Sequence, residues 1–195
     1  MINEVIYVAR PIEYNKEEVL SNAMEIFWHK GFESTSMKDL VMATGLTTRS
    51  MYNIFESKDG LFQEALKCYY DTRVKLSLEE LKQDKGIKGI RSFISKIAGL
   101  FETSNGCLYT NTLSDRYSID PKSMCFVDGF FEELEEVLID KLKYAKEYEG
   151  YSENPVNGAK LLVVIIQGMS VYSKKFESIE ERRESLEGII SLLKI

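Results

Sequence analysis

Residues 47–58 concentrate side chains that can bond to nucleic-acid bases or to phosphates. Thr48, Arg49 and Asn53 offer hydrogen-bonding groups suited to base edges or phosphate oxygens, and Tyr52 can bind a phosphate while its ring stacks. Lys58 follows Ser57 at the start of a predicted helix, where free backbone N–H groups and a full positive charge together favour a phosphate. From residue chemistry alone, the candidate contacts are Thr48, Arg49, Tyr52, Asn53 and Lys58.

Two short helices joined by a glycine turn would position these side chains. Ser36-x-x-Asp39 approximates a capping box for the first helix, and Gly45 ends that helix because glycine tolerates positive φ. Thr47 then caps the second helix. The arrangement matches the signature of a helix-turn-helix. The apolar positions follow a helical period and are Met37, Leu40 and Val41 in the first helix and Met51, Ile54 and Phe55 in the second.

The register of the second helix decides which of its side chains face outward. If the apolar positions are buried, Thr48, Arg49, Tyr52 and Asn53 must point away from the core, and Glu56 lies at the far end, outside any groove. An ordinary solvated helix face is the alternative interpretation for any one of these residues. Their joint placement on one short capped helix favours a surface that binds DNA.

These features resemble the DNA-binding domain of TetR-family transcriptional repressors over about the first 60 residues. The matching anchors occur in the family's order along the chain. They are Ala9-Arg10-Pro11, Ala23-x3-Phe27-x3-Gly31-Phe32, Thr35-Ser36-Met37-Lys38-Asp39-Leu40, Gly45-Leu46-Thr47, Met51-Tyr52-x2-Phe55, Ser57-Lys58 and Leu61-Phe62. Further along, Gly106-Cys107-Leu108-x2-Asn111-Thr112 resembles a motif in the second domain of one branch of the same family.

The resemblance implies specific roles for several residues. Tyr52 and Lys58 would bind phosphates, Thr47 to Ser50 would approach bases, and Thr35 or Ser36 would contact the DNA backbone. Arg49 stands where the family usually has a small residue, and Asn53 stands where histidine is frequent. These two departures affect the operator sequence rather than the mode of binding.

The charge of this region is unusual for a protein that binds nucleic acid. Residues 1–60 carry six basic and nine acidic side chains, a net charge of −3, whereas the window 34–58 has a net charge of +1. We expect affinity to come from a few well-placed contacts that dimerisation doubles, with a shallow dependence on salt. Residues 1–13 form either an arm through which Arg10 reaches DNA or an ordinary disordered terminus.

Composition argues against several classes of protein. The single histidine and the absence of hydrolase, zinc-peptidase and phosphate-loop motifs argue against an enzyme, and we expect no cofactor and no metal site. Three widely spaced cysteines argue against a disulfide framework, the first residues lack the features of a secretory signal, and the longest apolar run, Leu161–Ile166, is too short to span a membrane. We therefore expect a cytoplasmic protein without membrane contact.

Few prolines and few β-branched runs predict an all-α fold of two domains. Residues 1–62 would form the three-helix DNA-binding domain with its arm, and residues 63–195 a helical bundle that binds an effector and dimerises. A long helix from Leu61 to about Leu81 would join the two. The first predicted helix of the chain starts near Asn15. Four further helices are predicted over Ile87–Glu102, Pro121–Tyr148, Gly158–Phe176 and Ile179–Leu193.

The resemblance also implies a homodimer through the last two helices, which would present two recognition helices to a pseudo-palindromic double-stranded operator. A monomer with a buried central helix is the alternative. A small apolar or aromatic effector would bind between bundle helices and release a repressor from DNA, with a candidate pocket lined by Phe93, Phe101, Tyr109, Phe126, Phe130, Met169 and Tyr172.

Two other functions remain open from the sequence. Cys107 and Cys125 lie near predicted helix starts, where a thiolate is stabilised, so the chain could sense oxidants through a thiol instead of binding an inducer. The acidic net charge of −6 is also compatible with a helical protein-interaction module that retains a helix-turn-helix.

Overall fold

The computed structural model describes residues 14–100 and 105–175, together with positions 178, 180, 181, 184, 185, 188 and 191. Every regular element within these residues is helical, which confirms the predicted all-α fold. The proposed arm with Arg10, Phe101 of the candidate pocket and most of the predicted last helix lie outside the described residues.

Three short helices form the N-terminal unit: α1 (Lys16–Lys30), α2 (Met37–Thr44) and α3 (Thr48–Phe55). The side chain of Asn15 accepts hydrogen bonds from the first backbone N–H groups of α1, as its position in the sequence predicts. Phe27 of α1 is fully buried and meets the ring of Phe62 edge-on at a centroid distance of 4.8 Å. This aromatic pair fixes the unit to the next helix.

One long helical rod joins the N-terminal unit to the rest of the molecule. It consists of α4 (Lys58–Tyr69), a π-helical segment (Tyr70–Val74) and α5 (Lys75–Gln83). Its extent agrees with the predicted bridging helix from Leu61 to Leu81. The π segment was not predicted, because hydrophobic periodicity gives no signal for a single wider turn.

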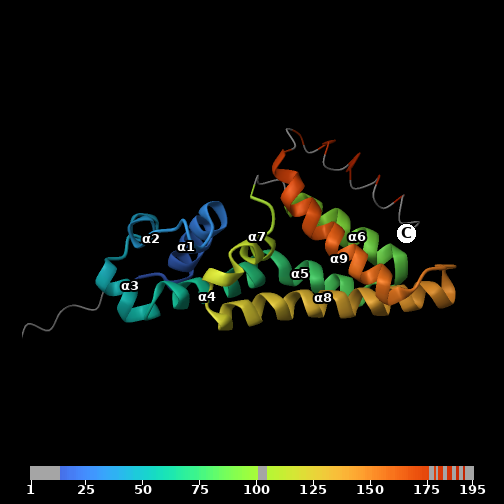
Figure 1. The fold of residues 1–195 in the computed structure, drawn as a ribbon, viewed down its shortest axis with the longest axis horizontal. Helices are drawn as coiled ribbons and strands as arrows, with labels where there is room; N and C mark the ends of the chain where they lie inside the picture. Colours follow the sequence, from blue (N-terminus) through green and yellow to red (C-terminus); the bar gives the residue numbers. More distant parts are fainter. Residues whose placement is uncertain are drawn as a thin grey trace, which may run out of the picture.

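The C-terminal unit is built on α6 (Gly86–Leu100), α8 (Pro121–Tyr148) and α9 (Pro155–Tyr172). Figure 1 shows α1–α3 gathered at one end of the molecule, α8 running along one side, and α6 and α9 toward the other end, with α7 (Leu108–Ser114) near the centre. Two 3₁₀ turns, Arg116–Ser118 and Ser173–Lys175, follow α7 and α9. The bounds of α8 match the predicted helix, whereas α9 begins and ends earlier than the predicted Gly158–Phe176.

Helix α9 leaves an apolar stripe uncovered. Leu161, Val164, Val171 and Tyr172 are 47%, 63%, 55% and 55% exposed, and with Gly168 they share one helix face. Of the described helices, α9 alone is long and apolar enough to cross a membrane by length and composition, a test that core helices of soluble proteins also pass. The opposite face of α9 packs against α8, with Leu162, Val163 and Ile166 buried.

Candidate nucleic-acid interface and apolar pocket

The turn before α3 places that helix through two local features. Gly45 adopts the left-handed conformation with φ of 71°, and its N–H donates to the carbonyl of Val41. The hydroxyl of Thr47 accepts the backbone N–H of Ser50 at 3.1 Å and also lies 2.9 Å from the Ser50 hydroxyl. The cap satisfies a backbone donor that would otherwise be unpaired at the helix start, so α3 begins at Thr48.

The outward face of α3 carries the side chains that the register predicts. Met51 and Phe55 are buried, while Thr48, Arg49, Tyr52 and Asn53 are exposed. Tyr52 keeps 48% of its surface accessible, although a large aromatic ring normally gains from burial. Four side chains able to contact bases or phosphates therefore lie together on the exposed face of one short helix.

Thr35 and Ser36 differ in what they can offer to DNA. Thr35 is buried, and its hydroxyl donates to the carbonyl of Gly31 at 2.7 Å, so its side chain closes α1 instead of facing solvent. This placement departs from the predicted DNA contact. Ser36 is exposed and forms the predicted capping box with Asp39, whose pKa is lowered by hydrogen bonds from Lys30 and Ser36.

Lys58 occupies the first turn of α4, but its ammonium is not fully free in solvent. The side chain is half-buried and its Nζ lies over the ring of Phe32, 4.3 Å from the centroid. Burial lowers the pKa of the Lys58 ammonium from its ordinary value. The hydroxyl of Ser57 caps the helix by accepting the N–H of Gly60 at 3.0 Å.

The connection between α3 and α4 is a strained turn at Glu56. Glu56 has φ of 65° and ψ of −41°, and the N–H of Ser57 donates to the carbonyl of Phe55 at 2.7 Å, which closes a three-residue turn. A positive φ is uncommon for a residue with a side chain. A Cβ at Gly60 would lie 2.1 Å from the carbonyl oxygen of Phe55, so only glycine allows this close approach of α4 to α3.

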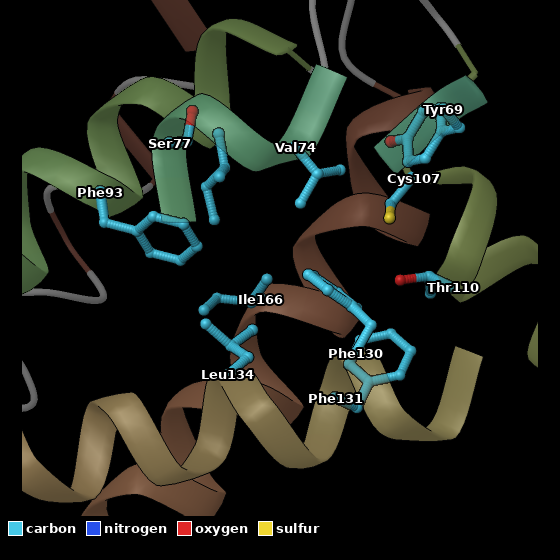
Figure 2. A pocket seen from close by; sticks show the side chains of 11 residues that line it. Tyr69, Val74, Ser77, Phe93, Cys107, Thr110, Phe130, Phe131, Leu134 and Ile166 are labelled. Atoms are coloured by element: carbon cyan, nitrogen blue, oxygen red, sulfur yellow. The ribbon is translucent and has the colours of Figure 1, made fainter. Parts of the chain in front are cut away.

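The C-terminal unit contains an apolar cavity that opens to solvent. Figure 2 shows side chains from the α4–α5 rod, α6, α8 and α9 and from the start of α7 converging on it. None of the lining residues carries a charge. They are Tyr69, Val74, Ser77, Phe93, Ile97, Cys107, Thr110, Phe130, Phe131, Leu134 and Ile166.

Of the predicted pocket residues, Phe93 and Phe130 line this cavity. The other described ones do not, for identifiable reasons. Tyr109 is fully buried and its hydroxyl donates to the carbonyl of Leu66 at 3.1 Å. Phe126 packs edge-on against Tyr109, Met169 is buried in the core, and Tyr172 is exposed on α9.

Cys107, Thr110 and Phe131 line the cavity but were not among the predicted pocket residues. For Cys107 and Thr110, the available signals were the motif at residues 106–112 and the position of Cys107 near a predicted helix start, and neither indicates a cavity. The backbone N–H of Cys107 donates to the hydroxyl of Ser170 at 2.6 Å, which fixes the start of α7 to α9. The side chains of Cys107 and Thr110 face the cavity (Figure 2).

Residues around the cavity also contact the N-terminal unit. The buried ring of Tyr69 meets Trp28 of α1 at 5.2 Å and Tyr109 of α7 at 5.3 Å, both edge-on. The carboxylate of Asp115, directly after α7, accepts the backbone N–H of Phe32 at 3.1 Å. Structural contacts therefore connect the cavity walls to α1 and the segment that follows it.

Residues 19–65, from α1 through most of α4, match the sequence model of a family described as bacterial regulatory proteins, tetR family. The chain is 28% identical over 184 residues to the HTH-type transcriptional repressor ComR of Escherichia coli K12, an alignment that covers 88% of this chain and 85% of ComR. It is 22% identical over 173 residues to the HTH-type transcriptional repressor BdcR of the same organism, with 88% and 85% covered.

The solved structure of the TetR family transcriptional regulator CifR, a cysteine mutant complexed with 26-bp double-strand operator DNA, has the same fold. The TM-score is 0.80 at 20% sequence identity, and the match covers 93% of this chain and 98% of that chain. The long rod, the bundle and the N-terminal unit thus recur together in CifR.

Proposed function

We propose that this chain, which belongs to the TetR family of bacterial transcriptional regulators, is a cytoplasmic repressor that a small molecule releases from its operator. The observation that carries the proposal is the exposed face of α3. This face presents Thr48, Arg49, Tyr52 and Asn53, while the opposite, apolar face of the helix is buried. A short capped helix with this face is suited to the major groove, where side chains can read base edges.

The proposed mode of binding uses few contacts. Arg49 and Asn53 would reach bases, Tyr52 would bind a phosphate, and the exposed start of α2 at Ser36 would approach the DNA backbone. Lys58 would move its ammonium from the ring of Phe32 to a nearby phosphate, a small displacement of a flexible side chain. A complex with few phosphate contacts is compatible with the negative net charge of the DNA-binding domain.

A homodimer is supported by the apolar stripe on α9. Leu161, Val164, Gly168 and Val171 would meet the same face of a second copy, since a two-fold interface pairs a surface with itself. The predicted last helix would complete a four-helix interface. Two α3 helices would then face half-sites about one turn of DNA apart.

Release by an effector is supported by the contacts that link the cavity to α1. A molecule bound beside Tyr69 and Thr110 would favour one arrangement of the rod and of α7 over another. Because Tyr69 also touches Trp28, that preference would change the position of α1 and hence of α3. The two sites would be coupled in the thermodynamic sense, each ligand altering the affinity for the other.

Fluorescence anisotropy with duplexes from beside the protein's own gene tests the DNA-binding part. We expect the intact protein to bind one such duplex, and Arg49→Ala with Tyr52→Ala to weaken binding by roughly 100-fold without lowering the unfolding temperature. The matched control is Lys88→Ala with Tyr148→Ala, which also removes one exposed cation and one exposed tyrosine. If no duplex binds, the helical protein-interaction module becomes the better account.

A thiol-sensing regulator is a second candidate because Cys107 lines the cavity beside Tyr69. A hydroperoxide would oxidise the thiol to a sulfenic acid and leave as an alcohol. In this version, hydroperoxide would weaken DNA binding by the intact protein and leave Cys107→Ser unaffected. Cys125 is exposed and serves as the internal control through Cys125→Ser.

A further inference from the structure

The cavity is chemically different at its two ends. Figure 2 shows the polar atoms of Tyr69, Cys107 and Thr110 at one end, whereas Phe93, Leu134 and Ile166 line the other. The hydroxyl of Ser77 is directed away from the open space. A molecule filling the cavity would therefore meet hydrogen-bonding groups only at the end formed by α7 and the rod.

Thr110 is the polar group at that end without a partner. It is 7% exposed, and no hydrogen bond joins its hydroxyl to another described residue. The hydroxyl is not among the fully buried unpaired atoms of the described residues, which are Trp28 Nε1 and Ser123 Oγ, so a molecule in the cavity can reach it. Other threonines in or beside helices bond to the carbonyl four residues back: Thr44 to Leu40 at 2.7 Å and Thr112 to Leu108 at 2.8 Å. Thr110 lacks this bond because the residue four positions back, Gly106, precedes the helix.

Tyr69 is more enclosed than Thr110, at 2% against 7% exposed. Burial raises the pKa of Tyr69 well above its ordinary value, so its hydroxyl stays protonated. Thr110 presents its hydroxyl to the cavity in Figure 2 and can act as donor or acceptor. A ligand group that pairs this hydroxyl gains a hydrogen bond within an otherwise apolar lining, which favours binding.

We infer that the effector is an uncharged, mainly apolar molecule with one hydrogen-bonding group, and that Thr110 binds this group. This inference rests on the proposed function only in calling the ligand an effector. The chemical class of the ligand is argued from the lining of the cavity. A charged ligand would lose its hydration without an opposite charge in the lining. Phe93, Phe130 and Phe131 supply rings against which an aromatic or aliphatic body can pack.

Isothermal titration calorimetry on the full chain without DNA tests the inference, with para-propylphenol, propylbenzene and para-propylbenzoate as probes. We expect para-propylphenol to bind most tightly and para-propylbenzoate at least roughly 100-fold more weakly. Thr110→Val should weaken para-propylphenol about tenfold and leave propylbenzene unchanged, because only the hydrogen bond is removed. Thr110→Ser should restore the affinity for para-propylphenol.

Ser77→Ala is the matched control, since it removes another hydroxyl from the cavity wall but one that points away. Equal affinity for the benzoate and the phenol, an unchanged phenol affinity in Thr110→Val, or no binding by any probe at millimolar concentration would overturn the inference. Binding of para-propylphenol that leaves DNA affinity unchanged would instead refute release by an effector and keep the ligand class.

Discussion

Arg49 and Tyr52 are neighbours on the exposed face of α3, three residues apart, yet they would serve different purposes. A guanidinium can pair with two acceptors on one guanine, which makes its contribution depend on the base. A tyrosine hydroxyl that donates to a phosphate meets the same group in every sequence. The two side chains would therefore separate specificity from general affinity.

This division predicts different outcomes for two substitutions measured on a set of operator variants. Arg49→Ala should weaken the preferred duplex by roughly tenfold to 100-fold and reduce discrimination at one base pair of each half-site. Tyr52→Phe should weaken all duplexes by a similar factor of up to about tenfold. If Tyr52→Phe changed the base preference and Arg49→Ala did not, the assigned roles would be reversed.

At the level of single residues, the sequence could predict exposure on α3 but not occupancy of the cavity. Helical periodicity was enough to place Arg49 outside because Met51 and Phe55 fix the register. Thr35 looked like a surface hydroxyl, and only the fold reveals that Gly31 offers its carbonyl to it. Tyr109 could not be told from a pocket residue, since every core aromatic has the same sequence signature.

Helix α7 is the element that connects the cavity, helix α9 and the N-terminal unit. Its start is bonded to Ser170 of α9, and a Cβ at Gly106 would lie 2.4 Å from the carbonyl oxygen of Ser170. Beyond its two ends, Asn105 lies 3.0 Å from the ring nitrogen of His29 and Asp115 accepts the N–H of Phe32. A displacement of α7 would thus be transmitted to α1 from both sides.

The link through Asp115 can be broken selectively. Asp115→Leu leaves the partly buried N–H of Phe32 without an acceptor and should cost about 1–3 kcal/mol of stability. It should also reduce the ratio of operator affinities measured without and with para-propylphenol. Thermal unfolding and anisotropy measure the two effects.

The control for Asp115→Leu is Asp140→Leu, which removes an exposed carboxylate on α8. It should change neither the stability nor the ratio of operator affinities. An intact affinity ratio in a destabilised Asp115→Leu variant would mean that Asp115 is structural and that coupling follows the rod instead.

Helices with strong local sequence signals were predictable, whereas helices that form because neighbouring elements bury them were not. Asp120 and Pro121 mark the start of α8 with a cap and a proline, and the apolar period continues over its whole length. Helix α7 is short and rich in threonine, a poor helix former, and it forms because Leu108, Tyr109 and Thr112 are buried by neighbours. The π segment likewise depends on packing rather than on composition.

The N-terminal unit lies at one end of the molecule, and α9 with its exposed apolar stripe lies toward the other (Figure 1). A symmetric pair joined through α9 would hold two distant α3 helices in a fixed relation. Each monomer alone offers few contacts, so pairing would supply much of the operator affinity through effective concentration.

Val164→Glu tests this arrangement because Val164 is the most exposed of the stripe's four large apolar residues, at 63%. A carboxylate there would be desolvated beside its symmetry mate, so we expect light scattering to give the mass of a monomer at micromolar concentration. Leu76→Glu, on an apolar residue of α5 that is 70% exposed, is the matched control and should remain dimeric. A dimeric Val164→Glu would place the interface elsewhere.

The net charge of −6 predicts a shallow salt dependence of operator binding. If Lys38, Arg49 and Lys58 are the cations that enter the DNA surface and displace counterions, roughly three counterions per monomer are released, and the slope of log affinity against log salt is about −5 for the dimer. Titrations at several salt concentrations measure this slope. A release of ten or more counterions per monomer would show that a further basic surface participates.

The most direct test of the account is selection from a pool of random duplexes by the full chain, with Arg49→Ala selected in parallel. We predict that the intact protein enriches a pseudo-palindromic sequence with half-sites about one helical turn apart, and that Arg49→Ala relaxes the preference at one symmetric pair of positions. No enrichment by the intact protein, or an identical motif for both proteins, would contradict the claim that the exposed face of α3 reads DNA.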